Sequence, residues 1–195
     1  MSIENPKSPG AAPNAPPAPS PAGLLIRPST EADIGAIQAI YENAVLHGTG
    51  TFETEAPDRS EMARRRTEVL GRGLPWLVAE SDGRVLGYAY ANYFRPRMAY
   101  RFCVEDSIYL HPDARGRGLG RLLLAELMAR CQAAGARQML AVIGDSENHG
   151  SIGVHRALGF AHTGVLKSSG WKFGRWLDVV LMQRALGTGD QDAPT

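Results

Sequence analysis

A short stretch at residues 111–120, HPDARGRGLG, combines three glycines with two arginines between an apolar segment and a leucine-rich one. The preceding SIYL favours a strand and the following RLLLAELMARC favours a helix. The first N–H groups of a helix are unpaired and lie at the positive end of its dipole, and glycines let an anion approach them closely. The stretch therefore predicts a site for a phosphate-bearing ligand.

Two familiar phosphate-binding loops do not fit this stretch. A Walker loop needs Lys followed by Ser or Thr after its last glycine, whereas Arg121 and Leu122 follow Gly120. The dinucleotide fingerprint G-x-G-x-x-G needs a glycine where this chain has Arg121. The remaining pattern is Arg-x-x-Gly-x-Gly, which Arg115, Gly118 and Gly120 form at a strand-to-helix corner.

The elements around this corner alternate between strands and helices, with hairpins in the first and last thirds of the chain. Such an order predicts an α/β fold with a mixed sheet and helices on both faces. Strands are expected at 24–28, 75–80, 85–94, 101–110, 137–144, 160–170 and 177–186, and helices at about 30–47, 58–73, 119–133 and 148–159.

The two ends of the chain have a different composition from this central part. Residues 1–23 are rich in Pro, Ala, Ser and Gly and cannot bury enough apolar surface to offset the entropy of ordering, so we expect a disordered tail. Residues 187–195 indicate the same. The expected domain therefore spans residues 24–186.

The formal net charge of +1 provides no overall field to recruit nucleic acid or a membrane surface. No apolar run reaches about 18 residues, and no signal peptide is visible at the N-terminus, so a cytoplasmic protein is expected. The two cysteines, Cys103 and Cys131, have the spacing of neither a disulfide framework nor a zinc site, and are expected to be buried thiols in a reducing compartment.

Three motifs in order along the chain resemble the GCN5-related N-acetyltransferases, the GNAT family. They are the acidic strand VEDSIYL, the Arg-x-x-Gly-x-Gly loop, and the set formed by Asn148, Ser151, His155 and LGF at 158–160. The longer stretches HGTGTFETEAP, YFRPRMAYRF, ENHGSIGVHRALGF and KFGRWLDVVLMQR are similar to the phosphinothricin and methionine sulfone/sulfoximine acetyltransferase subfamily. The resemblance runs from about residue 25 to 186.

This resemblance implies a GNAT fold with a mostly antiparallel, twisted mixed sheet, acetyl-CoA as cosubstrate, and a homodimer that uses the second helix and the terminal hairpin. It implies transfer of acetyl to the α-amine of a small amino acid analogue, serving antibiotic resistance or general detoxification. Two alternatives stay open. They are acetylation of another amine, such as a peptide N-terminus or a polyamine, and a non-catalytic acyl-CoA-binding module.

Acetyl transfer from a thioester to an amine needs a base for the ammonium proton, a polarised carbonyl and a proton for the leaving thiolate. By resemblance, Glu105 is the base and His155 is the acid. Asp106 is expected to face the opposite side of its strand, because side chains alternate, and to have a structural role. No metal is required, and the other histidines show no ligand spacing.

The resemblance also assigns the cofactor-binding residues. Backbone groups of the strand before the glycine loop are expected to run beside the pantetheine arm, and those of the loop to surround the pyrophosphate. Asn148 is expected to bind the arm, to cap its helix, or both. The expected contacts are Ile108, Tyr109, Leu110, Arg115, Gly116, Arg117, Gly118, Leu119, Gly120, Asn148 and Ser151.

An acceptor that carries a carboxylate favours a bidentate arginine, and Arg95 and Arg97 are the candidates. Further wall candidates for the small-molecule amine are Phe52, Glu53, Tyr100 and Lys172. Three other aromatic residues are expected in the core, namely Trp76, Tyr90 and Trp176.

Overall fold

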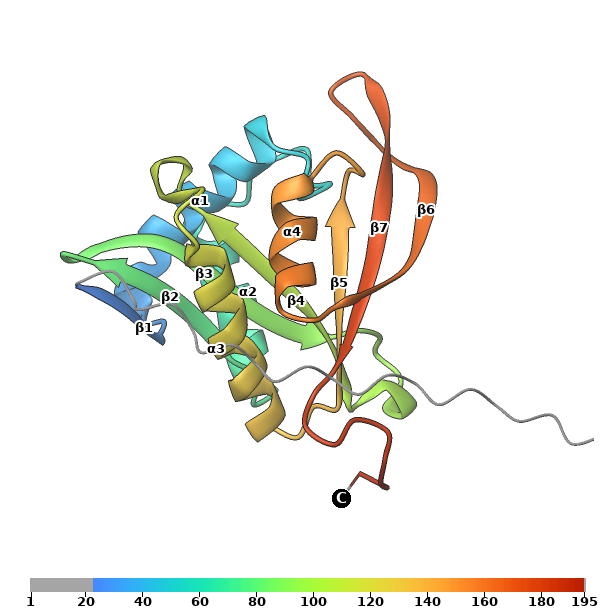
Figure 1. Cartoon of the computed structure of the whole chain (residues 1–195). Coiled ribbons are helices and arrows are strands. Elements are labelled where there is room, and N and C mark those ends of the chain that lie inside the picture. The colour runs from blue at the N-terminus through green and yellow to red at the C-terminus, as the bar shows by residue number, and fades with distance from the viewer. Residues whose placement is uncertain (1–22, 195) are drawn as a thin grey trace, which may run out of the picture.

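The structure is a computed structural model that describes residues 23–194. These residues form a seven-stranded sheet in the order β1-β2-β3-β4-β5-β7-β6 (Figure 1). Adjacent strands are antiparallel except β4 and β5, which run parallel. The strands are β1 (Leu24–Pro28), β2 (Trp76–Ser81), β3 (Arg84–Tyr93), β4 (Cys103–Leu110), β5 (Gln138–Gly144), β6 (Ala161–Lys172) and β7 (Arg175–Ala185).

Four helices cover the two faces of this sheet. The first two, α1 (Ile34–His47) and α2 (Arg59–Gly71), lie behind it in Figure 1, whereas α3 (Leu119–Ala133) and α4 (His149–Ala157) lie in front. Short 3-10 turns occupy η1 (Glu31–Asp33), η2 (Met98–Tyr100) and η3 (Pro112–Ala114). The predicted α/β fold, with a mostly antiparallel mixed sheet and helices on both faces, is confirmed.

The helices start where side chains replace missing backbone partners. Asp58 caps α2 because its carboxylate accepts from the backbone N–H of Glu61. Thr30 and Asp33 form a capping box ahead of α1. Asn148 caps α4 by accepting from the backbone N–H of Ser151.

The hydrophobic core lies on both faces of the sheet. On the α3 face the helix contributes the fully buried leucines Leu123, Leu124 and Leu127. On the α1 face a row of aromatic rings packs against the strands. In this row the rings of Trp76 and Tyr90 stack with centroids 4.2 Å apart.

The sheet opens between its two parallel strands. β4 and β5 pair from Cys103 opposite Gln138 to Asp106 opposite Ala141, and neither strand pairs with the other beyond that point. Both strands nevertheless continue, β4 to Leu110 and β5 to Gly144, and they diverge in Figure 1. The inner edges of both strands therefore keep backbone groups that no neighbouring strand uses.

The β6–β7 hairpin corrects one expectation about the core. Trp76 is 1% exposed, as predicted, but Trp176 is 61% exposed and Trp171, its cross-strand partner, is 57% exposed. Their ring centroids lie 5.2 Å apart. The prediction for Trp176 was wrong because the end of this hairpin extends beyond the helices, and its face with Trp171 and Trp176 stays open to solvent within residues 23–194.

The predicted N-terminal tail lies outside the described residues, apart from Gly23. At the other end, residues 187–190 form a turn, and Arg137 donates to Thr188 and to Asp192. The predicted disorder of this C-terminal segment stays a prediction. Within residues 23–194 we find no helix with the length and apolar character that crossing a membrane requires.

Candidate active site

A cavity of about 960 Å³ lies at the opening between β4 and β5. Its walls come from the loop after α1, the free part of β4, the glycine loop, the free part of β5, α4 and the start of β7. The sheet opening and the helix N-terminus therefore meet in one site. Most of the residues predicted from the sequence to bind the cofactor line it.

The glycine loop is built to hold an anion. Gly116 and Gly118 have φ values of 74° and 77°, and a Cβ at either position would meet nothing within 4 Å. No protein group of the described chain accepts a hydrogen bond from the backbone N–H groups of residues 116–120, because the first helical bonds start from Arg121 and Leu122. The left-handed glycines thus turn a row of free N–H groups toward solvent at the start of α3.

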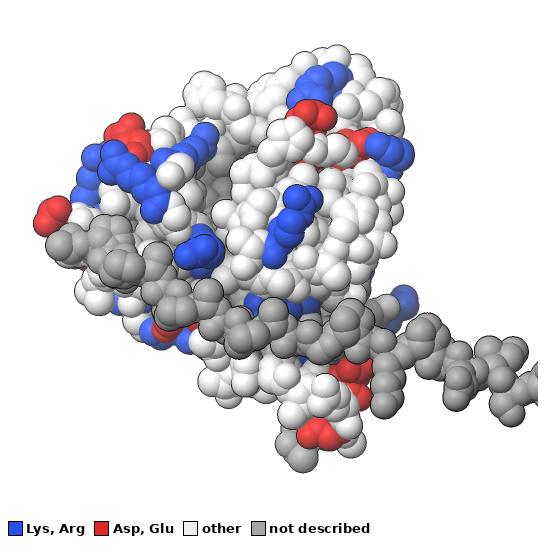
Figure 2. All heavy atoms as spheres, in the orientation of Figure 1, with Lys and Arg blue, Asp and Glu red and all other residues white. Residues whose placement is uncertain are grey.

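Arginines surround this loop. Arg115, Arg117 and Arg121 are all exposed, and Figure 2 shows basic side chains gathered beside a hollow in this part of the surface. Arg115 lines the cavity, together with Gly116, Gly118, Leu119 and Gly120, whereas Arg117 lies outside the lining. The loop therefore offers backbone donors and guanidinium groups to a phosphate.

The opening itself is lined by further predicted residues. Ile108, Tyr109 and Leu110 of β4 line the cavity on one side, and Asn148 and Ser151 of α4 line it on the other. Asn148 uses its oxygen as the helix cap, and its Nδ2 lies 3.4 Å from the carbonyl oxygen of Gly144. The helix-capping role that the sequence suggested for Asn148 is confirmed.

Glu105 lies on the half of the cavity nearest α1. It shares its face of β4 with Tyr109, whose ring meets that of Tyr41 in α1 edge-on. Burial raises the pKa of Glu105, and the neighbouring charge of Asp106 raises it further, while Arg95 lowers it. A half-buried carboxylate with a raised pKa is a stronger proton acceptor than an exposed one.

His155 and Asp106 form a buried pair on the opposite half of the cavity. His155 Nε2 lies 3.0 Å from Asp106 Oδ2, and its Nδ1 lies 2.8 Å from the carbonyl oxygen of Ser151. Burial lowers the pKa of His155, but the hydrogen bond and charge of Asp106, together with the Ser151 carbonyl, outweigh it and raise the pKa. Both residues line the cavity. Sequence reasoning placed Asp106 on the opposite face from Glu105 but did not find this pairing.

The loop after α1 covers one side of the cavity and is fixed by Phe52. A Cβ at Gly170 would collide with the Phe52 ring, and one at Gly144 would collide with the Thr49 carbonyl oxygen and with the same ring, so the ring lies in a slot beside Gly144 of β5 and Gly170 of β6 that only glycines leave open. Phe52 also lines the cavity. Its predicted place in the wall is consistent with this geometry.

Lys172 holds the same loop through hydrogen bonds of its ammonium group. Its side chain is 4% exposed, and Nζ donates to the carbonyl oxygens of Gly48 and Thr51 at 2.8 Å each. Burial lowers the pKa of its ammonium. Lys172 was predicted to contact the acceptor, but it lies outside the cavity lining and its ammonium binds the loop.

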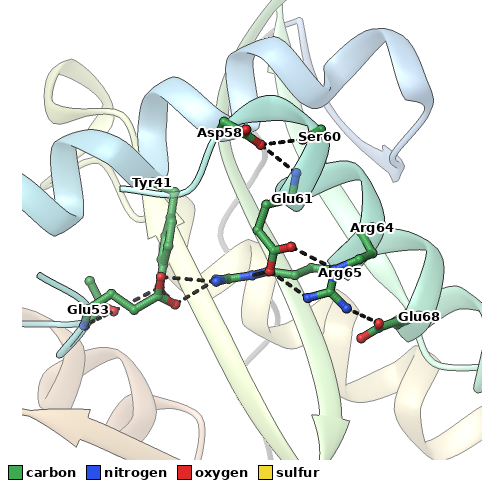
Figure 3. Close-up of polar contacts among 9 residues, drawn as sticks. Tyr41, Glu53, Asp58, Ser60, Glu61, Arg64, Arg65 and Glu68 are labelled. Carbon is green, nitrogen blue, oxygen red and sulfur yellow. Dashed lines mark hydrogen bonds and ion pairs between the residues drawn. The ribbon is translucent and has the colours of Figure 1, made fainter. Parts of the chain in front are cut away.

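Glu53 is the third anchor of this loop (Figure 3). Its Oε1 accepts from Tyr41 at 2.7 Å and from Arg65 Nη1 at 2.7 Å. Arg65 also donates to Glu61, which accepts from Arg64 as well, so the loop is tied to both α1 and α2. Glu53 was predicted in the acceptor wall, but it points into this network and lies outside the lining.

The remaining acceptor candidates do not reach the cavity. Arg95, Arg97 and Tyr100 are exposed on the segment between β3 and β4 and are absent from the lining. Arg175 does line it, and one of its nitrogens pairs with Asp145 Oδ2 at 2.6 Å. The sequence signal for Arg175 was the KFGRW stretch, which the motif comparison included without singling out the arginine.

Metal chemistry has no evident site in the described part of the chain, since no three or more His, Cys, Asp or Glu side chains cluster there closely enough to hold an ion. The two cysteines are free thiols, with Cys131 buried and Cys103 half-buried.

Known proteins resemble this chain in sequence and in overall structure. The family model described as Acetyltransferase (GNAT) family matches residues 37–160. A phosphinothricin N-acetyltransferase from Alcaligenes faecalis is 51% identical over 189 residues, which cover 93% of this chain and 96% of that protein. An L-methionine sulfoximine/L-methionine sulfone acetyltransferase from Salmonella typhimurium is 39% identical over 163 residues, which cover 84% of this chain and 95% of that protein.

A crystal structure of a phosphinothricin acetyltransferase from Sinorhizobium meliloti in complex with AcCoA superposes with a TM-score of 0.86. It is 50% identical, and the match covers 89% of this chain and 94% of that one. The sequence-based prediction of the family is therefore confirmed, and this chain belongs to the GNAT acetyltransferase family.

Proposed function

We propose that the protein is an acetyl-CoA-dependent N-acetyltransferase that acetylates the α-amine of a small amino acid analogue of the phosphinothricin or methionine sulfone/sulfoximine type. The observation that carries the proposal is the single cavity that joins the glycine loop, the open edge of β4 and Glu105. The named activities of relatives that are 51% and 39% identical support the acceptor class.

The residues divide the task between them. Free N–H groups of residues 116–120 and the Arg115 guanidinium would hold the pyrophosphate, and the free edge of β4 at Ile108–Leu110 would bind the pantetheine arm and polarise the thioester carbonyl. Glu105 would take the proton from the ammonium so that the neutral amine attacks directly. His155, on the other half of the cavity, would provide the proton for the thiolate.

Arg175 is the proposed partner of the acceptor's carboxylate. It is an arginine of the lining outside the glycine loop, and Asp145 orients its guanidinium while leaving further N–H groups free. Arg175→Gln should raise the KM for the amino acid at least tenfold and leave acetyl-CoA binding unchanged. Arg97→Gln is the matched control, because Arg97 is exposed outside the cavity. A larger effect of Arg97→Gln would return the role to the segment between β3 and β4.

We also propose a homodimer that uses the end of the β6–β7 hairpin. Trp171, Phe173 and Trp176 are each more than half exposed there, and exposed aromatic clusters of this kind are typical of interfaces. A cytoplasmic location fits the free thiols of Cys103 and Cys131. With phosphinothricin as the acceptor, the activity would confer resistance to it.

The experiment measures thiol release from acetyl-CoA with the purified protein and a panel of amines. The panel contains L-phosphinothricin, L-methionine sulfone, L-methionine sulfoximine, a polyamine and a short peptide. We expect turnover with the amino acid analogues alone. Turnover with only the peptide or the polyamine would refute the acceptor class, and binding of acetyl-CoA with no turnover on any amine would favour a binding module.

A further inference from the structure

The buried pair of Asp106 and His155 has a protonation state that its geometry dictates. A carbonyl oxygen can only accept, so the 2.8 Å contact with Ser151 requires the hydrogen on Nδ1 of His155. A neutral imidazole with its hydrogen on Nδ1 would then turn the lone pair of Nε2 toward the Asp106 carboxylate at 3.0 Å. Two acceptors repel each other at that distance, so one further proton must lie between Nε2 and Oδ2.

The burial of the pair makes this extra proton consequential. The side chains of His155 and Asp106 are 4% and 3% exposed, so water does not screen the contact. Asp106 Oδ1 is a buried oxygen for which the described chain supplies no donor. An unpartnered carboxylate oxygen in a cavity wall is costly unless it meets a donor from what the cavity binds.

Few other groups face the pair. From α3, Cys131 is buried and burial raises its pKa to about 12, so it is a neutral thiol at physiological pH. From β5, Ala141 lies opposite Asp106 and does not titrate. Glu105 projects from the other face of β4, and Ser151 from the preceding turn of α4 places its hydroxyl 3.4 Å from Nδ1 of the imidazole. Asp106 is therefore the anionic partner in contact with His155.

We propose that Asp106 is a positioning residue that keeps His155 doubly protonated in the cavity wall, so that the pair holds the proton taken up by the leaving thiolate. This inference rests on the proposed acetyl transfer and names the residue that prepares its acid. It differs from a merely structural salt bridge, because the shared proton must leave and return in each turnover.

The proton balance closes without a further reactant. When the bond between sulfur and the acetyl carbon breaks, its two electrons go to sulfur. The proton that His155 and Asp106 share then moves to this sulfur and forms the thiol. His155 is left neutral with its hydrogen on Nδ1, opposite the Asp106 carboxylate. The nitrogen loses two protons on the way from ammonium to amide, one before and one after the attack, and both leave through Glu105 to water. One proton from solvent restores His155, so each turnover releases one proton in total.

The test reads the protonation of His155 in the free protein by nitrogen-15 NMR, independently of any activity. The chain has five histidines, and His155→Gln identifies the relevant signal. We expect an imidazolium signature for His155 at pH 7 in the unchanged protein. In Asp106→Asn the midpoint of its titration should fall by about one pH unit or more, since one unit equals a tenfold change in proton affinity.

A second carboxylate provides a matched control. Asp113 lies 3.5 Å from His111 in an exposed pair, and Asp113→Asn should leave the His155 titration unchanged. A neutral His155 at pH 7 in the unchanged protein would overturn the proposal, and so would an unaltered midpoint in Asp106→Asn. The first of these results does not depend on Asp106→Asn, so it decides the matter even if that variant does not fold.

Kinetics distinguish this inference from the proposed function. In Asp106→Asn the basic limb of the kcat profile should move to lower pH by the shift seen in the NMR titration, while thermal stabilisation by acetyl-CoA persists. If the NMR titration midpoint of His155 shifts but the basic limb of the kcat profile does not move, Asp106 has only a structural role. That result would overturn the proposal that the pair supplies the proton for the thiolate. Absence of turnover in the unchanged protein, with the NMR result as expected, would instead refute the proposed function.

Discussion

Because the Phe52 ring fills the slot beside Gly170, we predict that Gly170→Ala destabilises the protein. A Cβ on Gly170 would overlap the Phe52 ring, whose Cζ would lie 2.9 Å from it, so either the ring or the strand must move. Gly170 lies in β6, and its backbone conformation is one that alanine adopts, so the clash is the only new cost. Overpacking of this kind costs about 1–3 kcal/mol. Because three ring atoms lie within the overlap, we expect about 2–3 kcal/mol for Gly170→Ala.

Gly164→Ala is the matched control for this substitution. Gly164 is in the same strand, and a Cβ there meets nothing within 4 Å. Its replacement should be neutral or stabilising by about 0.4–1 kcal/mol, because alanine restricts the unfolded chain. Urea unfolding of the two variants should therefore differ by about 3 kcal/mol, a gap that the method resolves.

A double-mutant cycle identifies the cause of the loss. In a Phe52→Ala background the overlap is gone, so Gly170→Ala should cost less than about 0.5 kcal/mol. The displaced loop should also raise the KM for the acceptor, while affinity for acetyl-CoA stays the same because the glycine loop is a separate segment. Equal stability of Gly170→Ala and Gly164→Ala, or a loss that persists without Phe52, would refute the slot.

Three further predictions concern charged residues. The Arg27 guanidinium holds the pKa of Asp33 at about 2, below the ordinary 3.8, so Asp33→Asn should lower the free energy of unfolding by about 2 kcal/mol at pH 7. This loss should be about half as large near pH 3, because the stability that a depressed carboxyl pKa provides disappears as the pH falls from the unfolded toward the folded pKa. Urea unfolding at both pH values would measure the two losses. Because burial raises the pKa of Glu105, the acid limb of the kcat/KM profile should lie above pH 4.5. Glu105→Gln should lower kcat by a factor of about 10²–10⁴. An acid limb that persists in Glu105→Gln would exclude Glu105 as the group whose titration causes it. Lys172→Met should destabilise the protein by about 2 kcal/mol and speed proteolysis within the loop at 48–53, because two carbonyl oxygens lose their donor. An unchanged rate of proteolysis in this loop would contradict the anchoring role of Lys172.

Local signals were sufficient to predict most elements and the glycine loop. Alternating apolar patterns and caps located the strands and the four helices to within a few residues, and the helix expected at 119–133 has those bounds. The anion site followed from Gly116, Gly118 and Gly120, because a glycine-rich helix N-terminus is a local feature of the chain. Glu105 and His155 were assigned as base and acid through the resemblance to a family, and both line the cavity.

Contacts between distant segments account for what sequence reasoning missed. Lys172 meets carbonyl oxygens more than 120 residues earlier in the chain, and a lysine in a hairpin is ordinarily solvated. Asp106 pairs with a histidine 49 residues away, and alternation gave its face but not its partner. Trp176 looked like a core residue because composition alone does not show that a hairpin extends beyond the helices.

The proposed activity requires that one cavity binds acetyl-CoA and an amino acid amine for direct transfer with Glu105 as base. The most direct measurement follows product and thiol together, by mass spectrometry and thiol release, with L-phosphinothricin and L-methionine sulfone in wild-type protein and Glu105→Gln. We predict N-acetylated product in equal amount to CoA in the wild type. In Glu105→Gln the rate should be lower by about 10²-fold or more, with unchanged acetyl-CoA binding. Product formation by Glu105→Gln at the wild-type rate, or CoA release without acetylated amine, would contradict the proposed activity.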